Sequence, residues 1–415
     1  MIAKTNRSVT YSRWLTNIVD THRFQSWNKE STDADEREEE ELNDSWAELD
    51  DAEKQRLWGL SADLYTLRDQ EKWVDSDWPP MSEEELRSAQ AEAFQAEEWD
   101  KLLEYLRRPP RFRLQATVDY MRGRAWQEMG HPDVALLFFD NAVRLDPSNP
   151  GYAEVALECL KAIRDWPEIL RRFEAYMLDS TTPPRLLFRA ADALRSYANQ
   201  SGERRYYQDG VRAVDEGFAR LQRSGGPEMS ATHVASAYAT KSLCLEHLGE
   251  TQASLQVVNE AVAKFPHDTL LLIVRGLVKQ QLGGADALVD FRNAVTEGSD
   301  IALPYIEVAR DAVQAGRNQE AIDLSRKGLA IARRSTDKSR LLELLAISSS
   351  RLDVSADSVR QVFESAAELD PLSEQIRANS EMFERFLASH ETQEPNWQLA
   401  QTPPRIAISH LQPAA

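Results

Sequence analysis

The sequence has few cysteines and no long apolar run. Its 415 residues include only Cys159 and Cys244, too few for a disulfide framework and not spaced as a C-x-x-C pair. We therefore expect both thiols to pack in the interior of a protein in a reducing compartment, the cytoplasm. No stretch of about 20 apolar residues occurs, so we expect no insertion into a membrane.

Motifs that carry chemistry are also missing. The chain has no glycine-rich phosphate loop, no H-E-x-x-H and no G-x-S-x-G. Its seven histidines are scattered, without the spacing of metal ligands. We therefore expect no enzymatic activity, no catalytic residue, no metal site and no cofactor.

Basic residues are outnumbered by acidic ones, 49 to 68, which gives a net charge of −19. A field of this sign repels phosphate, so we expect no nucleic-acid partner. Residues 28–53 hold 13 acidic and two basic residues, whereas residues 1–27 hold four basic and one acidic. We interpret 1–45 as a flexible segment, first basic and then acidic. Its acidic part fits a solvated spacer, a docking segment for a basic partner, or a surface on which residues 1–27 fold back.

Helical periodicity is abundant, and no period-two strand pattern occurs, so the sequence predicts an all-α fold. We interpret residues 46–115 as a helical N-terminal extension or as a degenerate repeat. Ser45 with Glu48, and Ser82 with Glu85, fit capping boxes that begin two of its helices. The first helix carries leucines three and four residues apart: Leu57, Leu60, Leu64 and Leu67.

A pattern of small, aromatic and proline residues recurs about every 34 residues. It is most complete in 116–149, which contains Gly123, Trp126, Gly130, Ala135, Phe139, Ala142 and Pro147. Residues 150–230 depart from the pattern. It returns with fewer matches in four later units, 235–268, 269–300, 302–335 and 340–373.

These units resemble the tetratricopeptide repeat family. The resemblance implies a right-handed superhelical solenoid of antiparallel helix pairs, with about seven units over 116–372. Small side chains such as Gly123 let the paired helices approach closely. Residues 373–388 then fit a capping helix, and residues 389–415, with four prolines, fit a disordered tail.

The resemblance also implies a binding function. In this family the first helix of each repeat lines a concave groove, through its second, fifth, ninth and twelfth positions, and the groove binds extended or helical peptide segments. We therefore predict a non-catalytic scaffold or adaptor whose partner is a protein or peptide. The predicted groove residues are Tyr120, Arg124, Gln127, Leu270, Ile273, Leu277, Ile306, Arg310, Leu344 and Arg351.

Two alternatives accompany this prediction. The apolar groove positions also fit packing in the core, which is the more common role of an apolar stripe on a repeat helix. The second alternative is a regulatory sensor whose repeat array changes curvature when a partner binds. In this alternative the tail, with Trp397 and Leu399, is an autoinhibitory ligand. The family's carboxylate clamp, which grips a chaperone C-terminus, is not expected here, because Tyr120, Glu154 and Val155 stand at clamp positions.

Overall fold

The structure is a computed structural model that describes residues 9–26, 46–67, 80–108, 113–224, 229–284, 286–352, 354–389 and 397–399. Within these residues the chain is helical and contains no strand, which confirms the prediction of an all-α fold. Two compact units, residues 1–169 and 170–415, make up the chain. The predicted acidic segment 28–44 and all of the predicted tail except 389 and 397–399 lie outside the described residues.

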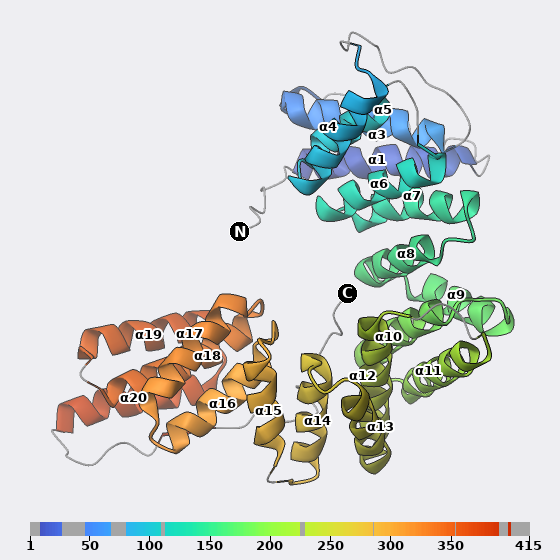
Figure 1. Ribbon diagram of the computed structural model, residues 1–415. Helices are drawn as coiled ribbons and strands as arrows, with labels where there is room; N and C mark the ends of the chain where they lie inside the picture. Colours follow the sequence, from blue (N-terminus) through green and yellow to red (C-terminus); the bar gives the residue numbers. More distant parts are fainter. Residues whose placement is uncertain are drawn as a thin grey trace. The chain divides into compact units, whose positions relative to one another are not determined.

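The first unit contains the helices that precede the repeats and the first repeat pair, α6 and α7, which pack side by side (Figure 1). Helix α9 crosses the boundary between the units. The helices are α1 (Val9–Ser26), η1 (Trp46–Glu48), α3 (Asp51–Thr66), α4 (Glu83–Gln95), α5 (Trp99–Arg107), α6 (Gln115–Glu128), α7 (Pro132–Leu145), α8 (Pro150–Ile163) and α9 (Trp166–Leu178).

Residues 9–26 form helix α1, which corrects the expectation that this part of the N-terminal segment is flexible. Tyr11, Leu15 and Val19 share one face of α1 and are buried. Trp14 packs edge-on against Trp46 of η1, with ring centroids 4.8 Å apart. This apolar face stabilises the helix, because burying it removes its side chains from water.

The capping box that begins α3 lies at Asp50 and Glu53. The Asp50 carboxylate accepts from the Glu53 backbone N–H at 2.7 Å, and the Glu53 carboxylate accepts from the Asp50 backbone N–H at 3.1 Å. The expectation that this helix begins at Ser45 is therefore wrong. The capping box of Ser82 and Glu85 at the start of α4 is confirmed.

Buried charged side chains connect four helices of the first unit. Arg122 of α6 pairs with Asp119 of its own helix at 3.3 Å and with Asp63 of α3 at 2.9 Å. Arg107 of α5 also pairs with Asp63, at 2.7 Å, and Asn141 of α7 donates to Asp119 at 2.7 Å. Such a network ties the helices that precede the repeats to the first repeat pair.

The second unit is a stack of antiparallel helix pairs that follow one another in chain order from α10 to α20 (Figure 1). Each helix packs against the next, and the first helices of successive pairs also touch, as in α10 with α12, α12 with α14, and α16 with α18. The helices are α10 (Pro184–Ser201), α11 (Arg204–Ser224), α12 (Ala231–Leu248), α13 (Thr251–Lys264), α14 (Thr269–Gln281), α15 (Ala287–Thr296), α16 (Leu303–Gln314), α17 (Asn318–Ile331), α18 (Ser335–Ser350), α19 (Ala356–Leu369) and α20 (Glu374–Ser389).

Tight turns join the helices of each pair. Gly249 and Gly316 follow α12 and α16 with φ of 80° and 72°, a left-handed conformation that glycine adopts without steric cost. The second helix then folds back antiparallel. One apolar cluster runs continuously from α12 to α20 and forms the core of this part of the stack.

Candidate functional site

The first helices of the pairs, α10, α12, α14, α16 and α18, together with α20, form what we call the first-helix face of the second unit. Five predicted groove residues belong to these helices but are buried in the core, where they offer no surface to a partner. They are Leu270, Ile273, Leu277, Ile306 and Leu344. This corrects the expectation of an apolar groove at these positions.

The physical reason is the number of neighbours that each first helix has. Helix α14 packs against α12, α13 and α15, so an apolar stripe on almost any of its sides faces another helix. Residues 270–274 and 276–278 of α14 are apolar or glycine and are all buried, so most of the circumference of this helix belongs to the core. Core packing, the alternative reading of these positions, is therefore the observed one.

The two predicted arginines of the second unit also have structural roles. Arg310 is buried and pairs with Glu307 of its own helix, at 2.9 Å for one of the two contacts. Arg351 donates to the backbone carbonyl of Val313 at 2.7 Å, which ties the end of α18 to the end of α16. The burial of Arg310 corrects the expectation that its side chain lines a groove, whereas Arg351 is partly exposed and its role in a groove stays a prediction.

The remaining three predicted residues lie in the first unit on α6. Tyr120 is partly buried, with its ring 5.9 Å from that of Phe139 and 5.4 Å from that of Tyr152. Arg124 donates to Gln127 at 3.1 Å on the same helix. The structure therefore divides the predicted groove residues between its two units, and their role as a binding surface stays a prediction.

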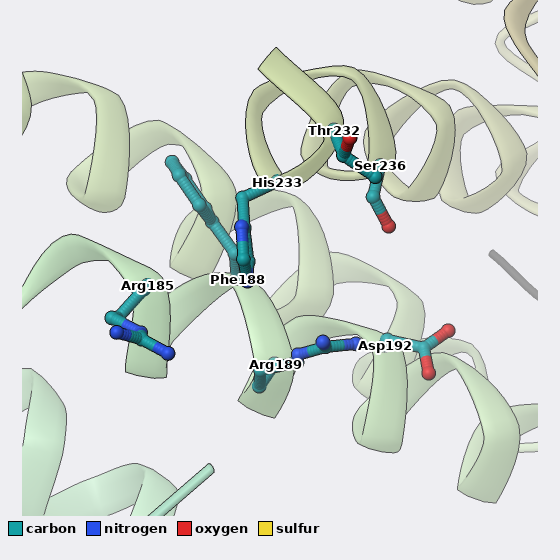
Figure 2. Close-up of a pocket in the computed structure, with 7 residues that line it drawn as sticks. All are labelled: Arg185, Phe188, Arg189, Asp192, Thr232, His233 and Ser236. Atoms are coloured by element: carbon teal, nitrogen blue, oxygen red, sulfur yellow. The ribbon is translucent and has the colours of Figure 1, made fainter. Parts of the chain in front are cut away.

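A small pocket, open to solvent, lies on the first-helix face between α10 and α12. Four of its lining residues come from α10 and three from the first two turns of α12, as Figure 2 shows. Two arginines, a histidine, two hydroxyls and a carboxylate surround one aromatic ring. The lining residues are Arg185, Phe188, Arg189, Asp192, Thr232, His233 and Ser236.

Local sequence explains why these polar groups converge. Helix α10 begins with Pro184 at a position where the missing N–H is harmless, and its apolar residues point into the core. Arg185 and Arg189, four residues apart, therefore share another side of the helix. Ser230 caps α12 by accepting from the His233 backbone N–H, and the Ser230 hydroxyl also contacts the His233 ring.

Arg185 and Arg189 bring positive charge to the pocket, and Asp192 brings a negative charge. Partial burial lowers the pKa of Arg185, and the neighbouring positive charge of Arg189 lowers it further. Asp192 is mostly buried and pairs with Arg195 at 3.0 Å. A carboxylate or phosphate placed between Arg185 and Arg189 would relieve the repulsion between the two guanidinium groups.

The sequence contained a signal for this site that our prediction did not use. The apolar spacing of Leu186, Leu187, Ala190, Ala191 and Leu194 defines the buried side of α10. It leaves Arg185 and Arg189 together on a different side. The contribution of His233 and Ser236 could not be read in the same way, because it depends on how α12 packs against α10.

Neither cysteine is placed for chemistry. Cys159 and Cys244 are fully buried, which confirms the prediction that they pack in the interior. Burial raises the pKa of each thiol to about 12, so the nucleophilic thiolate is scarce at neutral pH. Within the described ranges, no three histidine, cysteine or carboxylate side chains gather as a metal ion would require.

None of the helices in the described part of the chain combines the length and the apolar character needed to cross a membrane. The expectation of a cytoplasmic protein stays a prediction. The expectation that nucleic acid is not a partner also stays a prediction.

Comparisons with solved structures give matches at low sequence identity. No protein-family model and no curated protein matches the sequence. A tetratricopeptide repeat protein from Parabacteroides merdae is 16% identical, with 64% of this chain and 98% of that chain covered and a TM-score of 0.44. The Cut9–Hcn1 hetero-tetramer of APC/C is also 16% identical, covering 91% of this chain and 64% of that chain, with a TM-score of 0.44. A monomeric mutant of IFIT1 with Gppp-AAAA is 13% identical, covering 92% and 84%, with a TM-score of 0.43. The antiparallel helix pairs described above make the fold of this chain tetratricopeptide-like.

Proposed function

We propose that this protein is a non-catalytic scaffold that binds an acidic peptide segment of a partner protein on the first-helix face of its second unit. The observation that carries the proposal is the cavity between α10 and α12, where Arg185 and Arg189 stand four residues apart beside His233. A partner carboxylate between the two guanidinium groups forms charge-assisted hydrogen bonds in a partly desolvated place.

The other lining groups support a peptide over a small free anion. Phe188 gives the cavity an apolar wall, and the Thr232 and Ser236 hydroxyls can donate to or accept from a peptide backbone. A site of this composition can bind an acidic side chain of a peptide together with the neighbouring peptide backbone. Peptide recognition by arginine clusters follows the same physics.

The experiment is a selection of short displayed peptides on the full chain, followed by affinity measurement. We expect the selected peptides to be enriched in Asp and Glu, and we expect the double variant Arg185→Glu with Arg189→Glu to lose at least about tenfold in affinity for them. The matched control reverses the same charges at Arg333 and Arg334, which are exposed in the second unit and outside the cavity. An equal loss in both variants means that net charge, and not the cavity, governs binding, and this contradicts the proposal.

The sensor hypothesis is favoured by one observation of its own. Residues 397–399, which belong to the predicted tail, pack against helices α19 and α20, so a segment of the tail does occupy a place on the helices of the second unit.

A further inference from the structure

A short segment beyond the last helix packs against the core of the second unit. Trp397 is buried, and its indole stacks with the ring of Phe363 on α19 at a centroid distance of 6.3 Å and an interplanar angle of 24°. Leu399 is partly buried against the same apolar cluster, whereas Gln398 between them is exposed. This alternation is that of an extended chain, in which successive side chains point to opposite sides.

Asn379 of α20 holds this segment by its backbone. Its side-chain oxygen accepts from the Gln398 backbone N–H at 2.8 Å, and its side-chain nitrogen donates to the Gln398 backbone carbonyl at 2.8 Å. The side-chain amide of Asn379 thus bonds both the N–H and the carbonyl of Gln398. Two paired residues of an antiparallel sheet exchange the same two bonds. These two hydrogen bonds involve only backbone atoms of Gln398, so they do not depend on the side chain at position 398.

A hydrogen bond to Glu343 fixes the orientation of the Asn379 side-chain amide. Glu343 of α18 accepts from the Asn379 side-chain nitrogen at 2.7 Å and from the Gln375 side chain at 2.6 Å. A carboxylate accepts only, so it sets which end of the Asn379 amide is nitrogen. Asn379 and Glu343 are both buried, and burying polar groups is costly unless they are hydrogen-bonded.

This arrangement is built for an extended backbone but is not specific to residues 397–399. The backbone contact at Asn379 accepts any residue with an N–H group. The fit of Trp397 is imperfect, because its indole N–H is buried with no hydrogen-bond partner in the described structure. A buried donor without a partner weakens the docking of the segment.

We propose that α18, α19 and α20 form a binding site for an extended peptide in which an aromatic residue is followed two positions later by an aliphatic one, and that residues 397–399 occupy this site as an intramolecular competitor. The occupant in the free protein is the chain's own Trp397-Gln398-Leu399. A partner segment with the same pattern displaces it. This site lies apart from the α10–α12 cavity, so the proposal does not depend on the acidic-peptide function.

Competition by a tethered segment has a measurable consequence. A segment of the same chain has an effective concentration in the millimolar range, so it masks the site from a free peptide of the same sequence. Removing the internal occupant must therefore raise the apparent affinity for the free peptide.

The experiment is an anisotropy titration of a labelled peptide that copies residues 391–405, with the full-length wild-type chain and the full-length double variant Trp397→Ala with Leu399→Ala. We expect the variant to bind this peptide at least about tenfold more tightly than the wild type. Replacing the tryptophan of the peptide by alanine should abolish binding. Adding Asn379→Ala to the emptied variant should abolish it as well.

Two further variants separate backbone from side-chain contacts. Gln398→Pro keeps Trp397 and Leu399 but removes the N–H that Asn379 accepts from and fixes φ at position 398, so it should unmask the site as the double variant does. Gln398→Ala keeps the backbone and should behave as wild type. Equal affinity of the wild type and the emptied variant overturns the proposal. So does loss of helix in the emptied variant at the temperature of the titration, because residues 397–399 would then be needed for folding of the core.

Discussion

A β-carbon built on Gly123 of α6 would lie 2.5 Å from Cε1 of Phe139 on α7. The ring of Phe139 therefore occupies the space that a side chain at position 123 would need. The same relationship recurs in the second unit, where a β-carbon on Gly276 would lie 2.8 Å from Cε1 of Phe291. This confirms the prediction that small residues let the paired helices approach closely.

The Gly123→Ala variant should be destabilised because it forces the buried Phe139 ring to move. Overpacking of this kind costs about 1–3 kcal/mol, which is offset in part by the roughly 1 kcal/mol that alanine gains over glycine in a helix. A smaller side chain in the Phe139→Leu variant should remove the clash, so the double variant should be more stable than the sum of the two single changes predicts. Thermal unfolding of the four proteins measures this coupling. Simple additivity would contradict the packing account.

Arg122→Met should destabilise the first unit by about 3–5 kcal/mol, because it leaves the buried Asp119 carboxylate without its cation and leaves Asp63 with Arg107 alone. Burial already raises the pKa of Asp119, and the Arg122 charge opposes that rise. The folded state thus holds the Asp119 proton more tightly than the unfolded state does, so this group favours folding at low pH and loses that contribution as pH rises above its ordinary pKa.

The destabilisation by Arg122→Met should accordingly be smaller near pH 4, roughly the ordinary pKa of an aspartate, than at neutral pH. The measurement is the difference in thermal midpoint between variant and wild type at the two pH values. Adding Asp119→Asn should remove most of the pH dependence of that difference. A difference that is the same at both pH values would mean that lost packing, and not the uncompensated carboxylate, causes the effect.

Arg220 of α11 satisfies the end of α9 and the loop after it. Its guanidinium donates to the backbone carbonyls of Tyr176 and Asp179, at 3.1 and 2.6 Å, and also to those of Met177 and Thr182. Arg220→Lys keeps the charge but loses the planar fork, so we expect a loss of at least about 2 kcal/mol. The exposed Arg223 offers the control, where Arg223→Lys should change the free energy of unfolding by less than about 0.5 kcal/mol. Urea unfolding checks both values, and equal effects would argue against this capping role.

The two proposed peptide sites should differ in their response to salt. Binding at the α10–α12 cavity rests on charge at a partly exposed place, so affinity for an acidic peptide should fall as ionic strength rises. Binding at the Asn379 site rests on backbone hydrogen bonds and apolar burial, so its affinity should change little. Titrations of both peptides in low and high salt compare the sites within one protein. A steep salt dependence at the Asn379 site would contradict its assignment.

The repeating pattern of small and aromatic residues was enough to predict the helix pairs. Gly123 and Phe139 are recognisable in the sequence because the close approach of two helices permits few other choices. Burial was harder to predict. Ile273 and Leu344 sit where a groove residue was expected, and only the number of helices packed around them shows that they belong to the core.

The candidate sites depend on contacts between helices that are distant in sequence. The two arginines at the start of α10 share a side of one helix, so their proximity could have been read from spacing, whereas the approach of His233 could not. The contact of Asn379 with Gln398 is likewise invisible in the sequence, because one amide and one backbone group carry no periodic pattern. The helix over residues 9–26 was missed because the neighbouring charge dominated the reading of that segment.

The most direct test of the central claim is hydrogen–deuterium exchange of the full chain, with and without a saturating acidic peptide from the selection. Exchange reports where a bound segment shields backbone amides, independently of any substitution. The account predicts slower exchange in the early turns of α10 and α12, around Arg185 to Asp192 and Thr232 to Ser236. Protection that leaves these turns unchanged and appears elsewhere would contradict it.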